Sequence, residues 1–118
     1  MLGWKVMGAG VPSLEVIALT QDTATSVSAA GTTQGTATEL SSADNEVATV
    51  AAGAGVVLSS KLAPGDTQTV FNAGANPLKV YPPSGAAINA ASANAAYSHT
   101  AQTAHQFKCF SATQWFAL

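Results

Sequence analysis

His99, His105 and Cys109 have the side chains most suited to chemistry, and all three lie near the C-terminal end of the chain. Imidazole and thiolate groups bind zinc, but a structural zinc site needs four converging ligands. The spacing of these residues matches no zinc pattern, and the sequence offers no evident fourth ligand. We therefore predict no metal site, and expect half-exposed strand histidines and a buried, apolar thiol instead.

Nucleophilic and acid–base catalysis receive no better support. Serines are plentiful, but none lies in the Gly-x-Ser-x-Gly elbow that exposes a nucleophile. Paired carboxylates would suit glycoside hydrolysis. The acidic candidates occur in polar or turn-like contexts typical of capping and solvated loops: Glu39, Asp44, Glu46 and Asp66. No glycine-rich phosphate loop is present. We predict that the chain is not an enzyme and binds no cofactor.

The scarcity of charge sets this chain apart from an ordinary soluble domain. Charged residues make up 8% of its 118 residues, against about 25% in typical domains. All four cations are lysines and the net charge is −2. Nucleic-acid binding requires several cations on one face, so the composition argues against it.

Low charge also bears on assembly and location. A lone soluble protein usually keeps more charge for solubility, so we expect this chain to self-associate. No window approaches the length of an apolar membrane helix, and residues 1–20 lack the continuous apolar core of a signal peptide. We therefore expect no membrane contact and folding in a cytoplasm.

Short runs rich in branched and aromatic residues, separated by Gly, Pro and Asn, predict many short strands. The expected strands are Glu46–Val50, Val56–Leu58, Thr67–Asn72, Leu78–Tyr81, Ala86–Asn89, Ala96–His99, Ala104–Phe110 and Gln114–Leu118. Proline and glycine at Pro64–Asp66, Asn72–Pro77 and Pro82–Gly85 predict the tight reversals between them.

The first third of the chain is less regular. Met1–Ser13 is expected to be an irregular N-terminal arm, and Leu14–Thr20 either a strand or a short helix. Gln21–Thr38 is expected to be extended chain with a turn near Gly31. Ser41–Asp44 has the form of a capping box and predicts one helical turn.

These elements predict an all-β fold: a compact antiparallel β-sandwich or jelly-roll or barrel-like domain with an irregular N-terminal arm. We expect the arm to be residues 1–13 and the single β domain to be residues 14–118. The sequence shows no internal repeat at solenoid or propeller spacing.

Alternation within two strands assigns side chains to faces. It places Leu78 and Val80 opposite Lys79 and Tyr81 in one strand. In another strand it places Phe107 and Cys109 opposite Gln106 and Lys108. Most aromatic residues are expected in the core. Tyr81 is the exception, because it shares a face with Lys79 and an exposed tyrosine there suits a protein contact.

Several motifs resemble a pattern in small virion proteins of tailed bacteriophages. The resemblance covers about Gly31 to Trp115. It rests on Val56–Leu58, Pro64–Gly65, Thr69–Gly74, Leu78–Pro82, Gly85–Asn89, Phe107 and Ser111–Trp115. Such proteins are β-rich and occur as head decoration, or cement, proteins or as parts of tail appendages. The resemblance implies structural work in a particle and carries over no catalytic residue.

A small chain without repeats or a coiled-coil stalk favours a capsid decoration protein, expected as a homotrimer bound to the major capsid protein. It would reside in the virion, assembled in the cytoplasm of a bacterial host. The candidate protein-contact residues are Trp4, Leu14, Val16, Ile17, Leu19 and Tyr81. The alternative is a tail-fibre or appendage module that binds host-surface carbohydrate through exposed aromatic side chains.

Overall fold

A computed structural model describes residues 22–118 of the chain. Trp4 and the predicted contact residues between Leu14 and Leu19 therefore lie outside the described residues, as do the expected arm and the segment Leu14–Thr20, for which the sequence predicts a strand or a short helix. Within the described range, no helix is long and apolar enough to cross a membrane.

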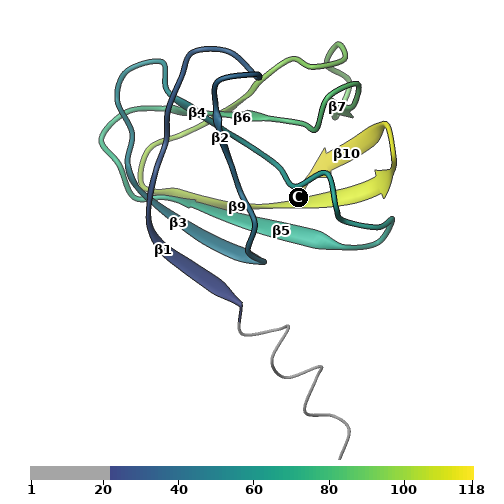
Figure 1. The fold of residues 1–118 in the computed structure, drawn as a ribbon, viewed down its shortest axis with the longest axis horizontal. Helices are drawn as coiled ribbons and strands as arrows, with labels where there is room; N and C mark the ends of the chain where they lie inside the picture. Colours follow the sequence, from purple (N-terminus) through teal and green to yellow (C-terminus); the bar gives the residue numbers. More distant parts are fainter. Residues whose placement is uncertain (1–21) are drawn as a thin grey trace, which may run out of the picture.

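The described residues form two facing β-sheets and no helix, which confirms the all-β prediction (Figure 1). The six-stranded sheet has the order β1-β3-β5-β9-β10-β7, and the four-stranded sheet the order β2-β4-β6-β8. The bounds in the larger sheet are β1 Thr23–Ser28, β3 Asp44–Thr49, β5 Thr67–Asn72, β7 Ala87–Ile88, β9 Thr103–Ser111 and β10 Gln114–Ala117. In the smaller sheet they are β2 Thr38–Glu39, β4 Gly55–Val57, β6 Leu78–Tyr81 and β8 Tyr97–His99.

The first six strands alternate between the two sheets, so the chain winds from one layer to the other and back. Each strand pairs in parallel with the strand one turn later: β1 with β3, β3 with β5, β2 with β4 and β4 with β6. This winding is solenoid-like. The prediction of an antiparallel sandwich or jelly roll is therefore wrong, because strand content and turn chemistry do not determine which strands become neighbours.

The C-terminal part closes the winding with antiparallel pairs. Strand β9 lies between β5 and β10 and is antiparallel to both. Strand β8 pairs antiparallel with β6 and forms one edge of the smaller sheet. The short strand β7 adds to β10 in parallel. As a result, β9 supplies the centre of the larger sheet although it is almost the last strand in sequence.

The core lies between the sheets and is built from inward-facing apolar side chains of both. Its largest fully buried members are Trp115, Phe107, Leu40, Leu58, Leu78 and Ile88. The predicted inward pair Phe107 and Cys109 is confirmed, since both are buried. Burial of large apolar side chains contributes about 1.5–3 kcal/mol each, so this layer accounts for much of the stability.

Tyr81 belongs to the interior, and the prediction that it is exposed is wrong. Its side chain is 7% exposed, and its hydroxyl donates a hydrogen bond to the carbonyl of Thr32 at 3.1 Å. The ring lies over Gly55, where a Cβ atom would come within 2.8 Å of Tyr81 Cε2. The missing side chain at Gly55 thus makes room for Tyr81, which leaves little tyrosine surface for a partner.

Buried amide side chains hold the loops at the ends of the larger sheet. Asn72 donates from Nδ2 to the carbonyls of Asn76 and His99, and its Oδ1 accepts from the backbone N–H of Gly74. Asn76 in turn donates to the carbonyl of Val50. Because unpaired buried carbonyls are costly, these bonds explain the asparagine-rich connection after β5.

The segment Ser41–Asp44 contains no helical turn, contrary to the prediction. Asp44 begins β3 instead, and its backbone N–H donates to the carbonyl of Asp22. The carbonyl of Ser42 accepts from the side chains of Asn45 and Gln68. Tertiary hydrogen bonds of this kind override a local capping signal.

Candidate functional site

The two histidines lie on facing strands and meet in the interior. His99 on β8 and His105 on β9 have ring centroids 4.9 Å apart at an interplanar angle of 84°. Tyr97 and Phe107 complete a cluster of four rings with edge-to-face contacts. His99 is fully buried, so the expectation of a half-exposed histidine is wrong for this residue.

The nitrogen atoms of this aromatic cluster are largely unpaired. His105 Nε2 lies 3.2 Å from the hydroxyl of Tyr97, whereas His99 Nδ1, His99 Nε2 and His105 Nδ1 are buried without a hydrogen-bond partner. Desolvation by burial, followed by the charge of His105, lowers the pKa of His99 to about 4, although the backbone of Thr103 acts in the opposite direction. The site therefore holds His99 as a neutral imidazole at neutral pH.

Cys109 does not join the histidines. It is buried further along β9, where its Sγ donates to the carbonyl of Ser111 at 3.3 Å. Burial, and then the charge of Asp66, raise the pKa of the Cys109 thiol. Residues 22–118 contain no group of three or more side chains that could hold a metal ion. The thiol is a structural side chain rather than a nucleophile.

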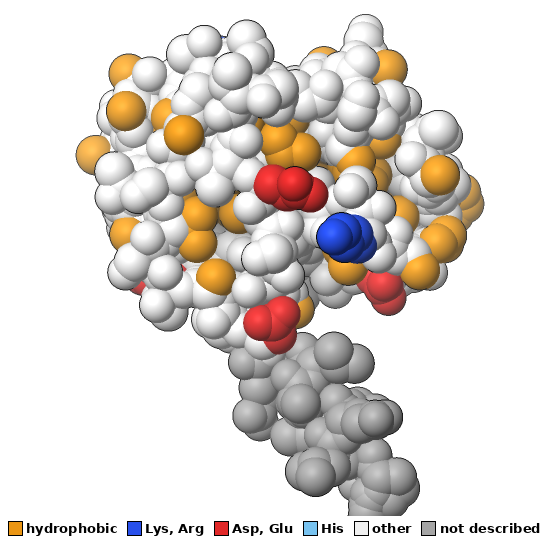
Figure 2. Space-filling model, viewed as in Figure 1, with side chains coloured by type: hydrophobic (Ala, Val, Ile, Leu, Met, Phe, Trp, Pro, Cys, Tyr) orange, Lys and Arg blue, Asp and Glu red, His pale blue; other side chains and the backbone are white. Residues whose placement is uncertain are grey.

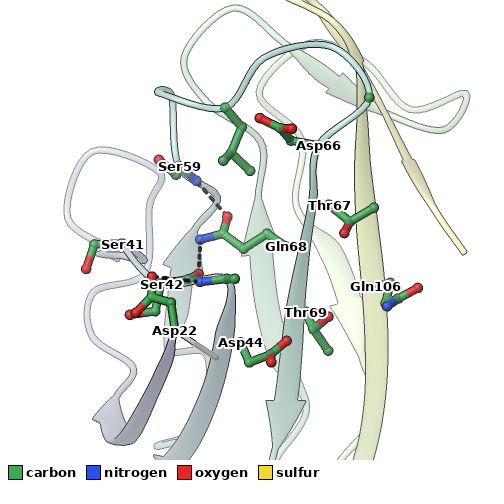
Figure 3. A pocket seen from close by; sticks show the side chains of 13 residues that line it. Asp22, Ser41, Ser42, Asp44, Ser59, Asp66, Thr67, Gln68, Thr69 and Gln106 are labelled. Carbon is green, nitrogen blue, oxygen red and sulfur yellow. Dashed lines mark hydrogen bonds between the residues drawn. The ribbon is translucent and has the colours of Figure 1, made fainter. Parts of the chain in front are cut away.

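A pocket of about 520 Å³ opens where the N-terminal ends of β1, β3 and β5 meet β9 (Figure 3). Hydroxyl, amide and carboxylate groups line it. They include Ser42, Asp44, Asp66, Thr69 and Gln106. Neighbouring strands bring them together, since Asp44 is the register partner of Thr69, and Thr69 that of Gln106.

Structural hydrogen bonds use some of the polar groups that line this pocket, chiefly the side chains of Gln68 and Asp66. Gln68 accepts from the N–H of Ser59 and donates to the carbonyl of Ser42, both at 2.9 Å. Asp66 accepts from the N–H of Ala63 at 2.9 Å, which closes its own turn. The aspartates do not converge on one point in Figure 3. The arrangement therefore offers no paired acid and base for catalysis.

An exposed aromatic pair stands on the outer face of the larger sheet. Phe110, at the end of β9, and Phe116, on β10, are 67% and 41% exposed. Their ring centroids are 5.8 Å apart at an interplanar angle of 82°. A hollow of about 430 Å³ beside them is bordered by Asn89, Ser111 and Gln114. We call Phe110 and Phe116 the phenylalanine pair.

On the face of the molecule drawn in Figure 2, charged side chains do not form a cluster. Figure 2 shows a face of mostly uncharged side chains, on which the acidic and basic groups are scattered rather than gathered. Phe71 on β5 is another large apolar side chain on the outer face and is 41% exposed. These phenylalanines expose apolar surface that contact with an uncharged partner would bury.

The sequence prediction missed the exposed phenylalanine pair, although alternation along the strands pointed to it. Alternation places Phe110 on the same face as Lys108, opposite Phe107 and Cys109. Adjacent residues of a strand point to opposite faces, so the burial of Trp115 places Phe116 outward. Of the predicted chemical residues in the described part of the chain, the structure places His99 against His105, and it places Asp44 and Asp66 in the lining of one pocket.

Comparison with known proteins adds no family to these observations. No protein-family model, no curated protein and no solved structure matches this chain.

Proposed function

We propose that this chain is a virion structural protein that decorates and stabilises the capsid of a tailed bacteriophage as a homo-oligomer. The observation that carries the proposal is the phenylalanine pair, which exposes apolar rings on a rigid sheet. The resemblance of Gly31–Trp115 to small phage virion proteins supplies the class of particle. The same proposal places the protein in the virion, after assembly in the cytoplasm of a bacterial host.

A second copy of the chain is the partner that best fits the phenylalanine pair. Identical apolar rings meet around a symmetry axis without any need for opposite charges. Lys108, the register partner of Phe116, suits a solvated rim, because it would repel its own copy at the centre. Charge-depleted cores with aromatic side chains are typical of such interfaces. A homotrimer is the assembly that we propose.

Contact with the major capsid protein is assigned to the N-terminal segment. This segment contains Trp4 and the apolar residues Leu14, Val16, Ile17 and Leu19. It joins the described domain at Asp22, directly before β1 at the edge of the larger sheet. Strand β10, which carries Phe116, is four positions away in the sheet. The proposed capsid and sister-subunit contacts would therefore lie toward opposite sides of the same sheet.

The first test replaces both rings of the phenylalanine pair. A Phe110→Ser/Phe116→Ser variant should elute as a monomer in size-exclusion chromatography with light scattering, while its circular dichroism spectrum stays all-β. Phe71→Ser is the matched control, because Phe71 and Phe116 are both 41% exposed. An unchanged oligomer in the double variant, or equal dissociation in the control, would remove the phenylalanine pair from the interface.

The second test concerns the particle itself. Deletion of residues 1–13 should weaken co-sedimentation with capsids and leave the β domain folded. Full binding by the truncated chain would argue against the arm. Labelling of purified particles should find many copies spread over the head, and copies confined to the tail tip would contradict decoration.

The carbohydrate-binding alternative has one supporting observation, the hollow beside the phenylalanine pair. Sugar recognition needs polar groups that are available to the ligand. Gln114 Nε2 already donates to the carbonyls of Asn89 and Trp115, and Asn89 Oδ1 accepts from the N–H of Ala117. The hollow thus offers few polar groups that are not already hydrogen-bonded within the domain. A glycan array tests this alternative directly.

A further inference from the structure

The segment between Asn94 and Gln102 is anchored firmly at its two ends and more weakly in between. It contains β8, an edge strand with three register partners on β6. Both bounding residues have positive φ, 68° at Asn94 and 62° at Gln102. Each is anchored: Asn94 bonds Gly85 and Ala86, and Gln102 bonds Asn72, Ala73 and Gly74. Residues 95–101 thus form a flap between two fixed points.

The flap is closed by its inward side chains. Tyr97 and His99 project from β8 onto His105 and Phe107 of β9, in the opposite sheet. Asn72 of β5 adds a single hydrogen bond to the carbonyl of His99 at 3.1 Å. The flap also pairs with β6 over three residues, where Leu78 lies beside His99. In addition, the hydroxyl of Thr103 on β9 donates a hydrogen bond to the carbonyl of Thr100 at 2.7 Å. The aromatic cluster is therefore the main attachment of the flap to the larger sheet.

The surroundings of His99 suit a neutral ring and oppose a charged one. The rings of His105 and Phe107 from β9 face it, and Leu78 of β6 is its cross-strand neighbour. Asn72 bonds only the backbone carbonyl of His99, and the backbone of Thr103 is the one group that favours the charged ring. In the described part of the chain, neither imidazole is hydrogen-bonded to a carboxylate. An imidazolium at His99 would have no carboxylate partner among these groups, and its nearest ring neighbour would be His105, with ring centroids 4.9 Å apart. Buried charges without partners are strongly unfavourable.

We propose that the contact of His99 with His105 and Phe107 is an acid-sensitive latch, and that protonation of His99 opens the flap of residues 95–101 while the larger sheet remains folded. Opening breaks the edge pairing with β6, the hydrogen bonds from Asn72 and Thr103, and the aromatic contacts. Edge segments with few buried contacts open locally at lower free energy than the core. The opened flap would hydrate both imidazoles and uncover Phe107 on β9.

The sign of the pH effect follows from the protonation states. Above pH 6.5 both states of His99 are neutral, and the flap stays closed. Below that value the open state binds a proton that the closed state resists until about pH 4. If opening restores the ordinary pKa of 6.5, the opening equilibrium rises about twentyfold at pH 5 and about a hundredfold at pH 4 relative to pH 7.

Amide hydrogen exchange followed by NMR on the full chain tests the latch, with rates corrected for the intrinsic pH dependence. Protection in residues 95–101 should fall from pH 7 to pH 4 by the factors above, while amides of β3 and β5 keep theirs. In His99→Phe, which keeps an aromatic ring but cannot ionise, flap protection should no longer depend on pH.

Unchanged flap protection in the native chain would overturn the proposal, as would simultaneous loss of protection in β5. An equal acid response in His99→Phe would also overturn it. The native-chain measurement decides the question even if that variant fails to fold. These outcomes are independent of capsid binding and of oligomer formation, so failure of the latch leaves the proposed function untouched.

Discussion

At the scale of single residues, Cys109 is expected to be inert while the protein is folded. Burial and the charge of Asp66 raise the pKa of its thiol, so the reactive thiolate is disfavoured. The Sγ atom also donates to the carbonyl of Ser111. A disulfide reagent at neutral pH should label Cys109 slowly in buffer and rapidly in urea. Equally fast labelling in both conditions would show that the thiol is accessible in the native state.

Gly55 is a second residue at which a substitution should have a clear effect, because its environment has no room for a side chain. A Cβ atom there would approach both the carbonyl oxygen of Lys79 and Tyr81 Cε2 to 2.8 Å. Gly55→Ala should therefore lower the free energy of unfolding by about 1–3 kcal/mol, as overpacking does. Gly35→Ala is the control, since a Cβ atom at Gly35 would meet nothing within 4 Å beyond its own chain neighbours. Urea denaturation should show a much smaller change for that control.

At the scale of elements, Asn72, the last residue of β5, links this strand to β8 in the opposite sheet. Its Nδ2 donates to the carbonyls of Asn76 and His99. Asn72→Asp removes both donors and adds a buried charge, so the free energy of unfolding should fall by about 2–4 kcal/mol. Stability measured by urea unfolding checks this value.

The matched control for Asn72 is Asn94→Asp. Asn94 is exposed and uses its side-chain oxygen, which accepts from the N–H of Gly85 at 2.7 Å. Aspartate keeps that acceptor, so the substitution should be nearly neutral. A comparable loss in both variants would mean that added charge, rather than the lost donors, causes the destabilisation.

The strands themselves were predictable because their signals are local. Thr67–Asn72 and Leu78–Tyr81 have the predicted bounds, since branched residues and flanking Pro, Gly and Asn act over a few positions. Strand partners were not predictable. Parallel neighbours such as β3 and β5 are separated by a full turn of the winding, and the turns differ in length, so no fixed repeat marks them.

The candidate site was predictable only in part, for a related reason. His99 and His105 stand in different sheets, and only the packing of β8 on β9 brings their rings together. The polar residues Asn45, Gln68 and Asn72 are buried, although polarity alone suggests solvent exposure. Each of them bonds at least one backbone carbonyl that is more than twenty residues away in the sequence, and no local pattern records such a contact.

At the scale of the whole molecule, the winding separates the regions assigned to different partners. The N-terminal segment joins at β1, one edge of the larger sheet, and Phe116 lies on β10 near the other. The flap of residues 95–101 belongs to the smaller sheet. Under the proposed function, a subunit arranged in this way would contact the capsid at one margin and a sister copy toward the other, and the proposed latch would respond to acid separately.

The proposed assembly should depend on apolar contact rather than on charge. The chain has only four lysines and six acidic residues, and the phenylalanine pair has a single register neighbour with a charge, Lys108. Salt screens exposed ion pairs but leaves apolar burial largely intact, whereas sulfate strengthens it. Sedimentation at rising NaCl should therefore leave the oligomer unchanged, and sulfate should shift the equilibrium toward it. Dissociation by NaCl would instead identify an ionic interface, for which the outer face of the larger sheet offers too few charged groups.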